Sequence, residues 1–412
     1  MPNAPAPTIT TRTLFFMRED CNRVGRYFHL LDIMPLMKKV PVIFLFNSPI
    51  ASGCDYVTQT MRLVAKKHPS LGLALGDIIF LPKLFTEREP WVVRSLRGAI
   101  IIRPISVLPG VRFRWVRMAT YIVYALFLSL FMGLRYFGSK RVVWFFEPFH
   151  LPPLLRIFQS YVSIYDCVDY YPGFSEAAER EHVMLMRRAT YVFANSLPLL
   201  DQLKKMRKDV RAVPLGFSDR LFTTSSSTVE QSKNIFTVGF VGSISDRIDF
   251  PLLQHVVAAL PRVCFVFVGA KEVGVFGRKD NVERSFDLLL KHKNVRWING
   301  VAKERVPSVL QGIDIGIIPY REHKLFNRYS FPMKTLEYFS VGRPVVATDI
   351  VALRQYEALG LLTIARTPDA FVQAIRSLYA TGWDPSHQKR QRQHAKKHTW
   401  AKKINAIVSV IQ

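Results

Sequence analysis

The sequence predicts an α/β protein made of two Rossmann-like domains that face each other across a cleft. Two observations lead to this prediction. Short apolar strands alternate with helical segments through both halves of the chain. A polar segment without periodicity, residues 223–234, separates the two halves. We therefore expect an N-terminal domain over residues 1–222, a linker over 223–234 and a C-terminal domain over 235–412.

In the first half, residues 13–17, 24–38 and 40–46 read as a strand, a helix and a strand. This βαβ order predicts a parallel sheet, because a crossover helix returns the chain in the same direction. Further buried strands are expected at 99–102, 142–146, 161–165, 191–194 and 210–213, and helices near 54–67, 90–97 and 175–188.

The second half repeats the alternation of strands and helices after the polar segment. Strands are expected at 235–241, 263–268, 295–298, 313–318, 345–347 and 361–364. In open sheets of this kind, ligands bind beyond the carboxyl ends of the strands. The residues that follow these strands are therefore the first candidates for a site.

Residues 331–348 are the most informative part of the second half. Pro332 suits the first position of a helix, and Gly342 suits the position just after its end. Lys334 would then lie in the first turn, where free N–H groups and the helix dipole favour an anion. Glu337 follows on the same face. A cation at a helix N-terminus with a carboxylate one turn later suits a nucleoside diphosphate, although a solvated Lys–Glu pair is the alternative.

This segment also resembles the sugar-nucleotide site of GT-B glycosyltransferases, in which Pro-x-Lys-x-x-Glu-Tyr is followed by Gly-x-Pro-Val-Val. The chain is similar to family 4-like bacterial enzymes of the teichuronic-acid and xanthan type. The resemblance covers about residues 140–380. Its other motifs are residues 165–169, 238–249, 294–300 and 312–320.

The resemblance implies a nucleotide-sugar-binding C-terminal domain, an acceptor-binding N-terminal domain and a UDP-linked hexosyl or glycuronosyl donor. Gly242 and Ser243 follow the strand at 235–241, where a glycine lets the backbone approach a phosphate and a serine donates to it. Many relatives have an arginine in place of Ser243. Arg247 either supplies that charge or pairs with Asp249. Together with Lys334 and Glu337, these residues form the predicted donor site.

Two features of the site differ from common patterns. Many retaining relatives have a second glutamate eight positions before Glu337, where this chain has Tyr329, so the stereochemistry of transfer stays open. No Asp-x-Asp metal motif occurs at the expected diphosphate site. Lys334 and the basic segment after 313–318 can neutralise the leaving diphosphate, so we expect no metal or other cofactor. In that segment, Arg321, Lys324 and Arg328 form either a lid or a solvated loop.

A general base is needed to accept the proton of the acceptor hydroxyl, unless the departing phosphate takes it. Carboxylates that follow first-half strands are Asp20, Glu147, Asp166 and Asp169. By resemblance Asp169 is the first choice, with Asp20 as the other candidate. Asp166 is expected to have a local structural role.

The amino-acid composition limits the kinds of partner that the protein could bind. The formal net charge is +26, which attracts nucleic acid, anionic lipid or phosphorylated substrates. No nucleic-acid-binding motif accompanies it, and the basic run at 389–397 can be a solvated face. We therefore expect no nucleic-acid partner. Four widely spaced cysteines argue against a zinc site or a disulfide framework, and the first residues lack a secretory signal.

Residues 118–134 are uncharged and apolar, with Arg112, Arg114 and Arg117 before them and Arg135, Lys140 and Arg141 after them. A spanning helix would divide the N-terminal domain between two compartments. We therefore expect a helix that docks on an anionic membrane surface through Arg114, Arg117, Leu126, Phe127 and Phe131. A helix fully buried in the core is the alternative.

These observations together predict a peripheral glycosyltransferase on the cytoplasmic face of a membrane. It would transfer a sugar from a nucleotide donor to a lipid-linked or glycan acceptor in cell-surface polysaccharide or glycolipid synthesis. A non-catalytic α/β scaffold at the membrane is the main alternative, and a nucleic-acid-binding protein is a less favoured one.

Overall fold

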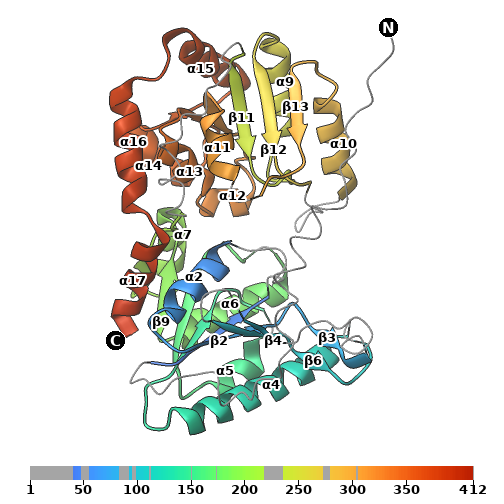
Figure 1. Ribbon diagram of the computed structural model, residues 1–412, viewed down its shortest axis with the longest axis vertical. Helices are drawn as coiled ribbons and strands as arrows, with labels where there is room; N and C mark the ends of the chain where they lie inside the picture. Colours follow the sequence, from blue (N-terminus) through green and yellow to red (C-terminus); the bar gives the residue numbers. More distant parts are fainter. Residues whose placement is uncertain are drawn as a thin grey trace. The chain divides into compact units, whose positions relative to one another are not determined.

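The computed structural model describes residues 40–47, 55–82, 92–94, 99–110, 113–149, 151–172, 174–217, 235–271, 279–302 and 305–411. All the described residues lie in one compact unit, Val40–Gln412. This unit is an α/β structure with two parallel sheets (Figure 1). The expected α/β fold with two parallel sheets is therefore confirmed.

The first sheet has eight strands in the order β10-β9-β8-β7-β1-β2-β5-β4. They are β1 (Val42–Phe46), β2 (Ser70–Ala74), β4 (Val92–Arg94), β5 (Ile100–Ile102), β7 (Val142–Phe145), β8 (Val162–Cys167), β9 (Tyr191–Ala194) and β10 (Arg211–Ala212). The paired strands are parallel, except for β4, which is antiparallel to β5. Two further short strands, β3 (Ile79–Phe80) and β6 (Ile105–Ser106), pair with each other.

The helices of this half are α2 (Asp55–Ala65), α4 (Arg114–Arg135), α5 (Leu151–Ile157), α6 (Glu176–Arg188) and α7 (Leu197–Lys204). Serines form the N-caps of two of them. Ser175 accepts a hydrogen bond from the Ala178 amide at α6, and Ser196 accepts one from Leu199 at α7. Each serine thus sets the residue at which its helix begins.

The second sheet has six parallel strands in the order β13-β12-β11-β14-β15-β16. They are β11 (Thr237–Val241), β12 (Cys264–Val268), β13 (Val295–Ile298), β14 (Ile315–Ile318), β15 (Val345–Ala347) and β16 (Thr363–Ile364). Helices α9 (Phe250–Ala259), α10 (Lys279–Leu289), α11 (Val306–Gln311), α12 (Leu325–Tyr329), α13 (Lys334–Val341), α14 (Arg354–Ala358) and α15 (Pro368–Thr381) accompany it.

The central strands are buried along their whole length because helices cover both faces of a parallel sheet. All five residues of β1 are buried, as are all four of β7 and of β14. Large aromatic side chains fill the first core, where the rings of Phe44 and Trp144 lie 5.5 Å apart. This burial fits the near-continuous apolar runs in the sequence of these strands.

The last two helices, α16 (Pro385–Lys397) and α17 (Trp400–Ile411), follow the second sheet in the chain. However, α17 packs beside α2 (Figure 1). Its residues Ile404, Ile407 and Val408 belong to the same buried cluster as β1 and β7 of the first sheet. The C-terminal segment thus completes the core of the first half of the chain.

Most expected elements occur within a few residues of their expected bounds, but two regions differ. The helix expected near 90–97 is wrong, because Val92–Arg94 forms the antiparallel edge strand β4. Strand β2 is not expected from the sequence, since Ser70–Ala74 contains a glycine and only two large apolar residues. The expected elements at 13–17 and 24–38, and the linker at 223–234, lie outside the described residues.

Candidate functional site

Helix α13 begins at Lys334 and ends at Val341, close to the expected bounds. Pro332 lies two residues before the helix rather than in its first turn. Gly342 ends it, as expected, with φ 71° in the left-handed region, where a side chain would be strained. The Arg343 amide then donates to the Tyr338 carbonyl at 3.0 Å. This turn leads the chain directly into β15.

Lys334 and Gly242 lie together at the N-terminus of α13. Gly242 follows β11 with φ 144°, and a Cβ atom at this position would collide with Cε and Nζ of Lys334. Any larger residue would therefore displace the lysine side chain. The structure thus brings together the two strongest elements of the predicted donor site, which lie 92 positions apart in the sequence.

Tyr338 fixes the position of α13 against β11. Its hydroxyl donates to the Gly239 carbonyl at 2.9 Å and accepts a hydrogen bond from the Val241 amide at 3.2 Å. Burial raises the pKa of Tyr338 well above its usual range. A neutral, doubly hydrogen-bonded hydroxyl in the core therefore sets the distance between the glycine turn and the helix that carries Lys334.

Tyr320 follows β14 and is almost fully buried beside two cations. Lys334 Nζ lies 5.9 Å from the centre of its ring, and the guanidinium of Arg247 lies 4.4 Å from the centre. Burial alone would raise the pKa of Tyr320, but the charges of Lys334 and Arg247 outweigh it and lower the pKa. The tyrosine therefore marks a region of positive potential at the carboxyl end of the second sheet.

Arg247 is held in place from two sides. Its Nε donates to Asn327 Oδ1 at 2.8 Å, and its guanidinium stacks over Phe326 at 4.5 Å. The Nη2 atom is buried and has no hydrogen-bond partner among the described residues. The alternative pairing with Asp249 is not found, since Asp249 accepts a hydrogen bond from the Leu252 amide and caps α9. Arg247 therefore keeps one donor for another group.

The segment between β14 and α13 is more ordered than a solvated loop. Residues Leu325–Tyr329 form the short helix α12. Arg321 Nε donates to the Ile248 carbonyl at 3.1 Å, and Lys324 forms an ion pair with Asp246. These contacts tie the segment to the turn after β11. In this structure Arg321 and Lys324 thus hold that turn.

Asp169 follows β8 of the first sheet and contacts a residue of the second half. Its Oδ1 accepts a hydrogen bond from Ser330 Oγ at 3.0 Å. Nearby, the rings of Tyr170 and Tyr329 lie 4.3 Å apart. Burial raises the pKa of the Asp169 carboxyl, although the charge of Arg247 and the Ser330 hydrogen bond oppose the rise. A raised pKa makes this carboxylate a better proton acceptor.

The other candidate carboxylates have different surroundings. Asp166 forms a buried ion pair with Lys403 of α17 at 2.9 Å, and both side chains are 1% exposed. Glu147 accepts a hydrogen bond from the Asn47 amide at 3.0 Å and so holds the end of β1. Asp20 lies outside the described residues. Of the candidate bases that the structure describes, Asp169 is the one in contact with the loop that leads into α13.

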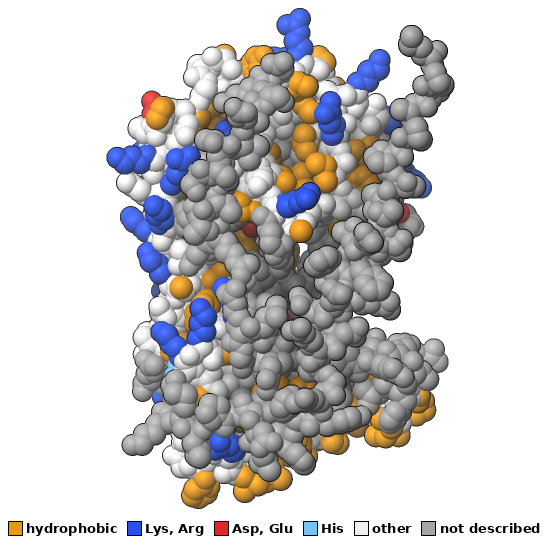
Figure 2. All heavy atoms as spheres, in the orientation of Figure 1, with side chains coloured by type: hydrophobic (Ala, Val, Ile, Leu, Met, Phe, Trp, Pro, Cys, Tyr) orange, Lys and Arg blue, Asp and Glu red, His pale blue; other side chains and the backbone are white. Residues whose placement is uncertain are grey.

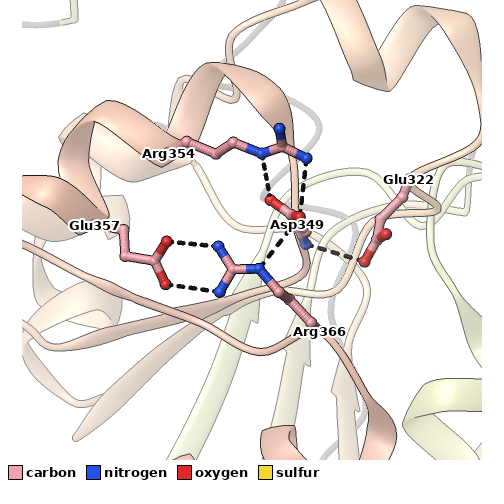
Figure 3. A network of polar contacts seen from close by, with 5 residues as sticks. All are labelled: Glu322, Asp349, Arg354, Glu357 and Arg366. Atoms are coloured by element: carbon pink, nitrogen blue, oxygen red, sulfur yellow. Dashed lines mark hydrogen bonds and ion pairs between the residues drawn. The ribbon is translucent and has the colours of Figure 1, made fainter.

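A network of charged side chains joins Glu322, which follows β14, to residues that follow β15 (Figure 3). Asp349 binds Arg354 through two hydrogen bonds of 2.7 and 2.9 Å and lies 3.4 Å from Arg366. Arg366 also pairs with Glu357, and the Asp349 amide donates to Glu322. These arginines thus have carboxylate partners within the network, which ties the turn after β14 to the turn after β15.

Sequence reasoning missed three residues of this arrangement. Asn327 is fully buried and bonded to Arg247, and Ser330 bonds Asp169. Thr335 follows Lys334 and is fully buried, with an Oγ1 atom that has no described partner. Thr335 could have been noticed in the sequence, because it is a polar residue on a helix face that is otherwise apolar. The other two depend on contacts between distant segments.

Ser243 and Glu337 are half-buried, at the turn after β11 and in the first turn of α13. No group of three or more His, Cys, Asp or Glu residues that could hold a metal occurs in the described ranges. The described cysteines, Cys167 and Cys264, are buried and unpaired. The site is therefore cationic and polar, with backbone turns at the ends of β11, β14 and β15.

Comparison with known proteins finds a family model that matches the second half of the chain. Residues 235–381, which contain β11, Lys334 and Tyr320, match the family model of Glycosyl transferases group 1. This match shows that the second half of the chain is similar to the group 1 glycosyltransferases. Its relative in Bacillus subtilis (strain 168), named "Putative teichuronic acid biosynthesis glycosyltransferase TuaH", is 24% identical over 285 residues, which are 64% of this chain and 70% of that protein.

Solved structures show the same fold. Sucrose-phosphate synthase from Thermosynechococcus elongatus matches with a TM-score of 0.70 and 13% identity, covering 90% of this chain and 98% of that one. HepE from Anabaena, solved in complex with UDP-glucose, matches with a TM-score of 0.64 and 15% identity, covering 90% and 99%. The expected GT-B fold is thus confirmed.

Proposed function

We propose that this protein is a glycosyltransferase that uses a UDP-linked sugar and transfers it to a lipid-linked or glycan acceptor in cell-surface polysaccharide or glycolipid synthesis. The observation that carries the proposal is the position of Lys334 at the N-terminus of α13, against Gly242. Free amide groups, the helix dipole and an ammonium group favour a diphosphate at this point. Glu337, one turn later, would accept hydrogen bonds from the ribose hydroxyls.

Two similar proteins support UDP as the nucleotide of the donor and cell-surface polysaccharide synthesis as the pathway. HepE, which has a similar fold, was solved with UDP-glucose. The relative TuaH has a name that places it in teichuronic acid biosynthesis. Both support a hexosyl or glycuronosyl donor and a polymeric or lipid-carried acceptor for this chain. An expected lack of a metal remains a prediction.

In the proposed reaction, an acceptor oxygen forms a bond to the anomeric carbon of the sugar. The bond from that carbon to the UDP oxygen breaks, and UDP leaves with the electron pair. Lys334 and Arg247 would stabilise the negative charge that develops on the diphosphate. The acceptor proton would pass to Asp169, whose pKa is raised by burial. Asp20, the other candidate base, would have a smaller role.

We also propose that the enzyme acts as a peripheral protein on the cytoplasmic face of an anionic membrane. A lipid-carried acceptor is presented at such a surface, and the net charge of +26 would attract the protein to it. The domain assignment follows the same logic. Residues 1–222 would bind the acceptor, residues 235–412 would bind the donor, and residues 223–234 would link them.

Thermal unfolding in the presence of UDP, ADP, GDP and their sugar derivatives tests the donor. A ligand that binds only the folded state raises its stability, by about 2.7 kcal/mol at one hundred times its Kd. We expect UDP and UDP-sugars to raise Tm more than the other nucleotides. Release of UDP from the best UDP-sugar would then separate an enzyme from a non-catalytic scaffold.

Glycine variants offer a matched control for the site. Gly242→Ala should abolish the UDP-induced shift, because its Cβ would collide with Lys334. Gly382→Ala introduces a side chain at another positive φ but meets nothing within 4 Å, so the shift should persist. Equal shifts in both variants would contradict a donor site at Gly242. A shift with duplex DNA rather than with any nucleotide sugar would favour a nucleic-acid-binding protein.

A further inference from the structure

An exposed apolar surface runs along α4 in the first half of the chain. Figure 2 shows hydrophobic side chains gathered along the lower edge, where α4 lies in Figure 1. Leu130 is 64% exposed, Leu134 74% and Phe137 91%. We call this surface the α4 face, and it comprises Phe113, Trp115, Val123, Leu126, Phe127, Leu130, Leu134 and Phe137.

The members of the α4 face recur at helical spacing on one side of the helix. From Tyr121 onwards the opposite side is packed against the protein through Tyr121, Ala125, Leu128 and Met132, whereas Val116 and Thr120, in the first two turns, are buried on the side that is exposed further along. Polar contacts hold the packed side in place. Tyr121 Oη donates to the Leu75 carbonyl, and the Ile105 amide donates to Tyr124 Oη at 3.1 Å. From Tyr121 to Leu134 the helix therefore has one buried side and one exposed apolar side.

By length and composition, α4 is the one described helix that could cross a membrane. Its position in the fold argues against a span. Strand β5 precedes α4 and β7 follows it, and both belong to the first sheet, joined through β1 and β2. A spanning α4 would place two strands of one sheet in different compartments. The helix could therefore lie along a membrane but not pass through it.

The sequence segment that carries the α4 face contains basic residues but no acidic ones. No acidic residue occurs between Arg103 and Glu147, whereas the same stretch contains Arg112, Arg114, Arg117, Arg135, Lys140 and Arg141. The Arg114 side chain is 64% exposed, and its Nη2 atom lies 3.8 Å from the Glu181 carboxylate, which is 9% exposed. Two copies meeting through this face would bring their positive edges together. An anionic lipid surface instead complements the charges and accepts the apolar side chains.

We propose that the α4 face is the membrane-binding surface, with α4 lying parallel to an anionic bilayer. Its apolar side chains enter the boundary between headgroups and acyl chains, and its flanking cations contact lipid phosphates. Phe131, expected from the sequence to take part, is only half-exposed and supports the stacked ring of Phe127 at 6.4 Å. Trp115, Leu130, Leu134 and Phe137 extend the surface. The proposal deepens the peripheral location given under the proposed function.

Vesicle flotation of the full chain tests the proposal. The probe is a vesicle of phosphatidylcholine, with or without phosphatidylglycerol. We expect flotation with the anionic vesicles, reduced by salt because the charges are screened. Leu130→Glu combined with Leu134→Glu should lower partitioning about tenfold or more. Arg114→Gln combined with Lys140→Gln should lower it and weaken its dependence on salt.

The matched control makes the same leucine-to-glutamate substitutions at another part of the surface. Leu288 and Leu359 are exposed leucines of the second half, so Leu288→Glu combined with Leu359→Glu should leave flotation unchanged. Each variant is first shown to keep the circular dichroism and the UDP-induced thermal shift of the wild type. Because that shift needs no vesicles, loss of the shift concerns the donor site and loss of flotation concerns the α4 face.

Four results would overturn the proposal. The wild type could fail to float with anionic vesicles, or the Leu130 and Leu134 variant could float as the wild type does. Membranes could release the protein to detergent but not to carbonate or salt, which would indicate a spanning helix. Light scattering could show a dimer that the Leu130 and Leu134 variant dissociates, which would make the α4 face a subunit interface.

Discussion

The side chains near the carboxyl ends of the strands carry opposite charges in the two sheets. At the end of β8 of the first sheet, the chain places two carboxylates, Asp166 within the strand and Asp169 just after it. Beyond β11 and β14 of the second sheet, Arg247 and Lys334 surround the ring of Tyr320. The Ser330 hydrogen bond to Asp169 joins the two regions. In a transfer reaction, the cations suit the departing diphosphate, and a carboxylate suits the attacking hydroxyl.

The largest effect should come from the carboxylate side of this comparison. Asp169→Asn keeps the size of the side chain but removes the proton acceptor. We expect kcat to fall by roughly 10²–10⁴ while the Kd for UDP changes little, as steady-state kinetics and calorimetry would show. Asp201→Asn, on the exposed side of α7, is the control and should be silent.

Asp20→Asn should have a milder effect than Asp169→Asn. If Asp20→Asn is inactive and Asp169→Asn is nearly normal, the base lies near Asp20 instead. If both stay active, the leaving phosphate takes the proton, which would point to retention of configuration. Either result would break the assignment of acid–base chemistry to the loop after β8.

A stability measurement separates the two carboxylates. Lys403→Met leaves Asp166 charged and unpaired in the core, so urea unfolding should show a loss of roughly 3–5 kcal/mol. Lys402→Met changes the exposed neighbour and should have little effect. Adding Asp166→Asn to Lys403→Met should recover part of the loss. Equal stability of the two lysine variants would show that the buried ion pair does not hold α17 to the first sheet.

Two buried or half-buried histidines, one in each half of the chain, should make the free energy of unfolding depend on pH. Burial lowers the pKa of His182, in α6, to about 4, and the Tyr165 hydroxyl lies 2.8 Å from its Nδ1. Burial and nearby cations also lower the pKa of His394, in α16, to about 4. In the unfolded chain a histidine binds a proton below about pH 6.5. Stability is therefore fully present above that pH and is lost as the pH falls towards 4.

His182 should contribute about 1.4 kcal/mol per pH unit between pH 6 and 4.5, since the unfolded state binds the extra proton. His394 is only half-buried, so solvent screening should make its contribution smaller. His182→Gln and His394→Gln should each flatten the dependence of the unfolding free energy on pH in that window. Urea titrations at several pH values measure the slopes. A slope unchanged in His182→Gln would show that this side chain is already protonated in the folded protein.

The two regions also differ in how far the sequence predicts them. The turn at Gly242 and the helix from Lys334 to Gly342 depend on local backbone geometry, which glycine, proline and the apolar pattern reveal. The parallel strands are equally clear because their apolar runs are nearly continuous. The edge strand β4 and the glycine-containing β2 escape prediction, since pairing with neighbours rather than local propensity makes them strands.

Contacts between distant segments could not be predicted. The Asp166–Lys403 pair joins residues 237 positions apart, and the Ser330–Asp169 hydrogen bond joins residues 161 apart. Nothing in the sequence near Asn327 indicates that it would orient Arg247. Similarly, the apolar run at 118–134 indicates a docking or buried helix, but the structure was needed to show which side is exposed.

The most direct test of the donor site measures the binding of UDP and of inorganic pyrophosphate by calorimetry. Lys334→Ala should weaken both ligands by about 1.5–3 kcal/mol, because it removes a charge-assisted contact to phosphate. Glu337→Ala should weaken UDP but hardly affect pyrophosphate, and Lys389→Ala, on the exposed face of α16, should change neither. Unchanged UDP affinity in both Lys334→Ala and Glu337→Ala would contradict the assignment of α13 to the donor.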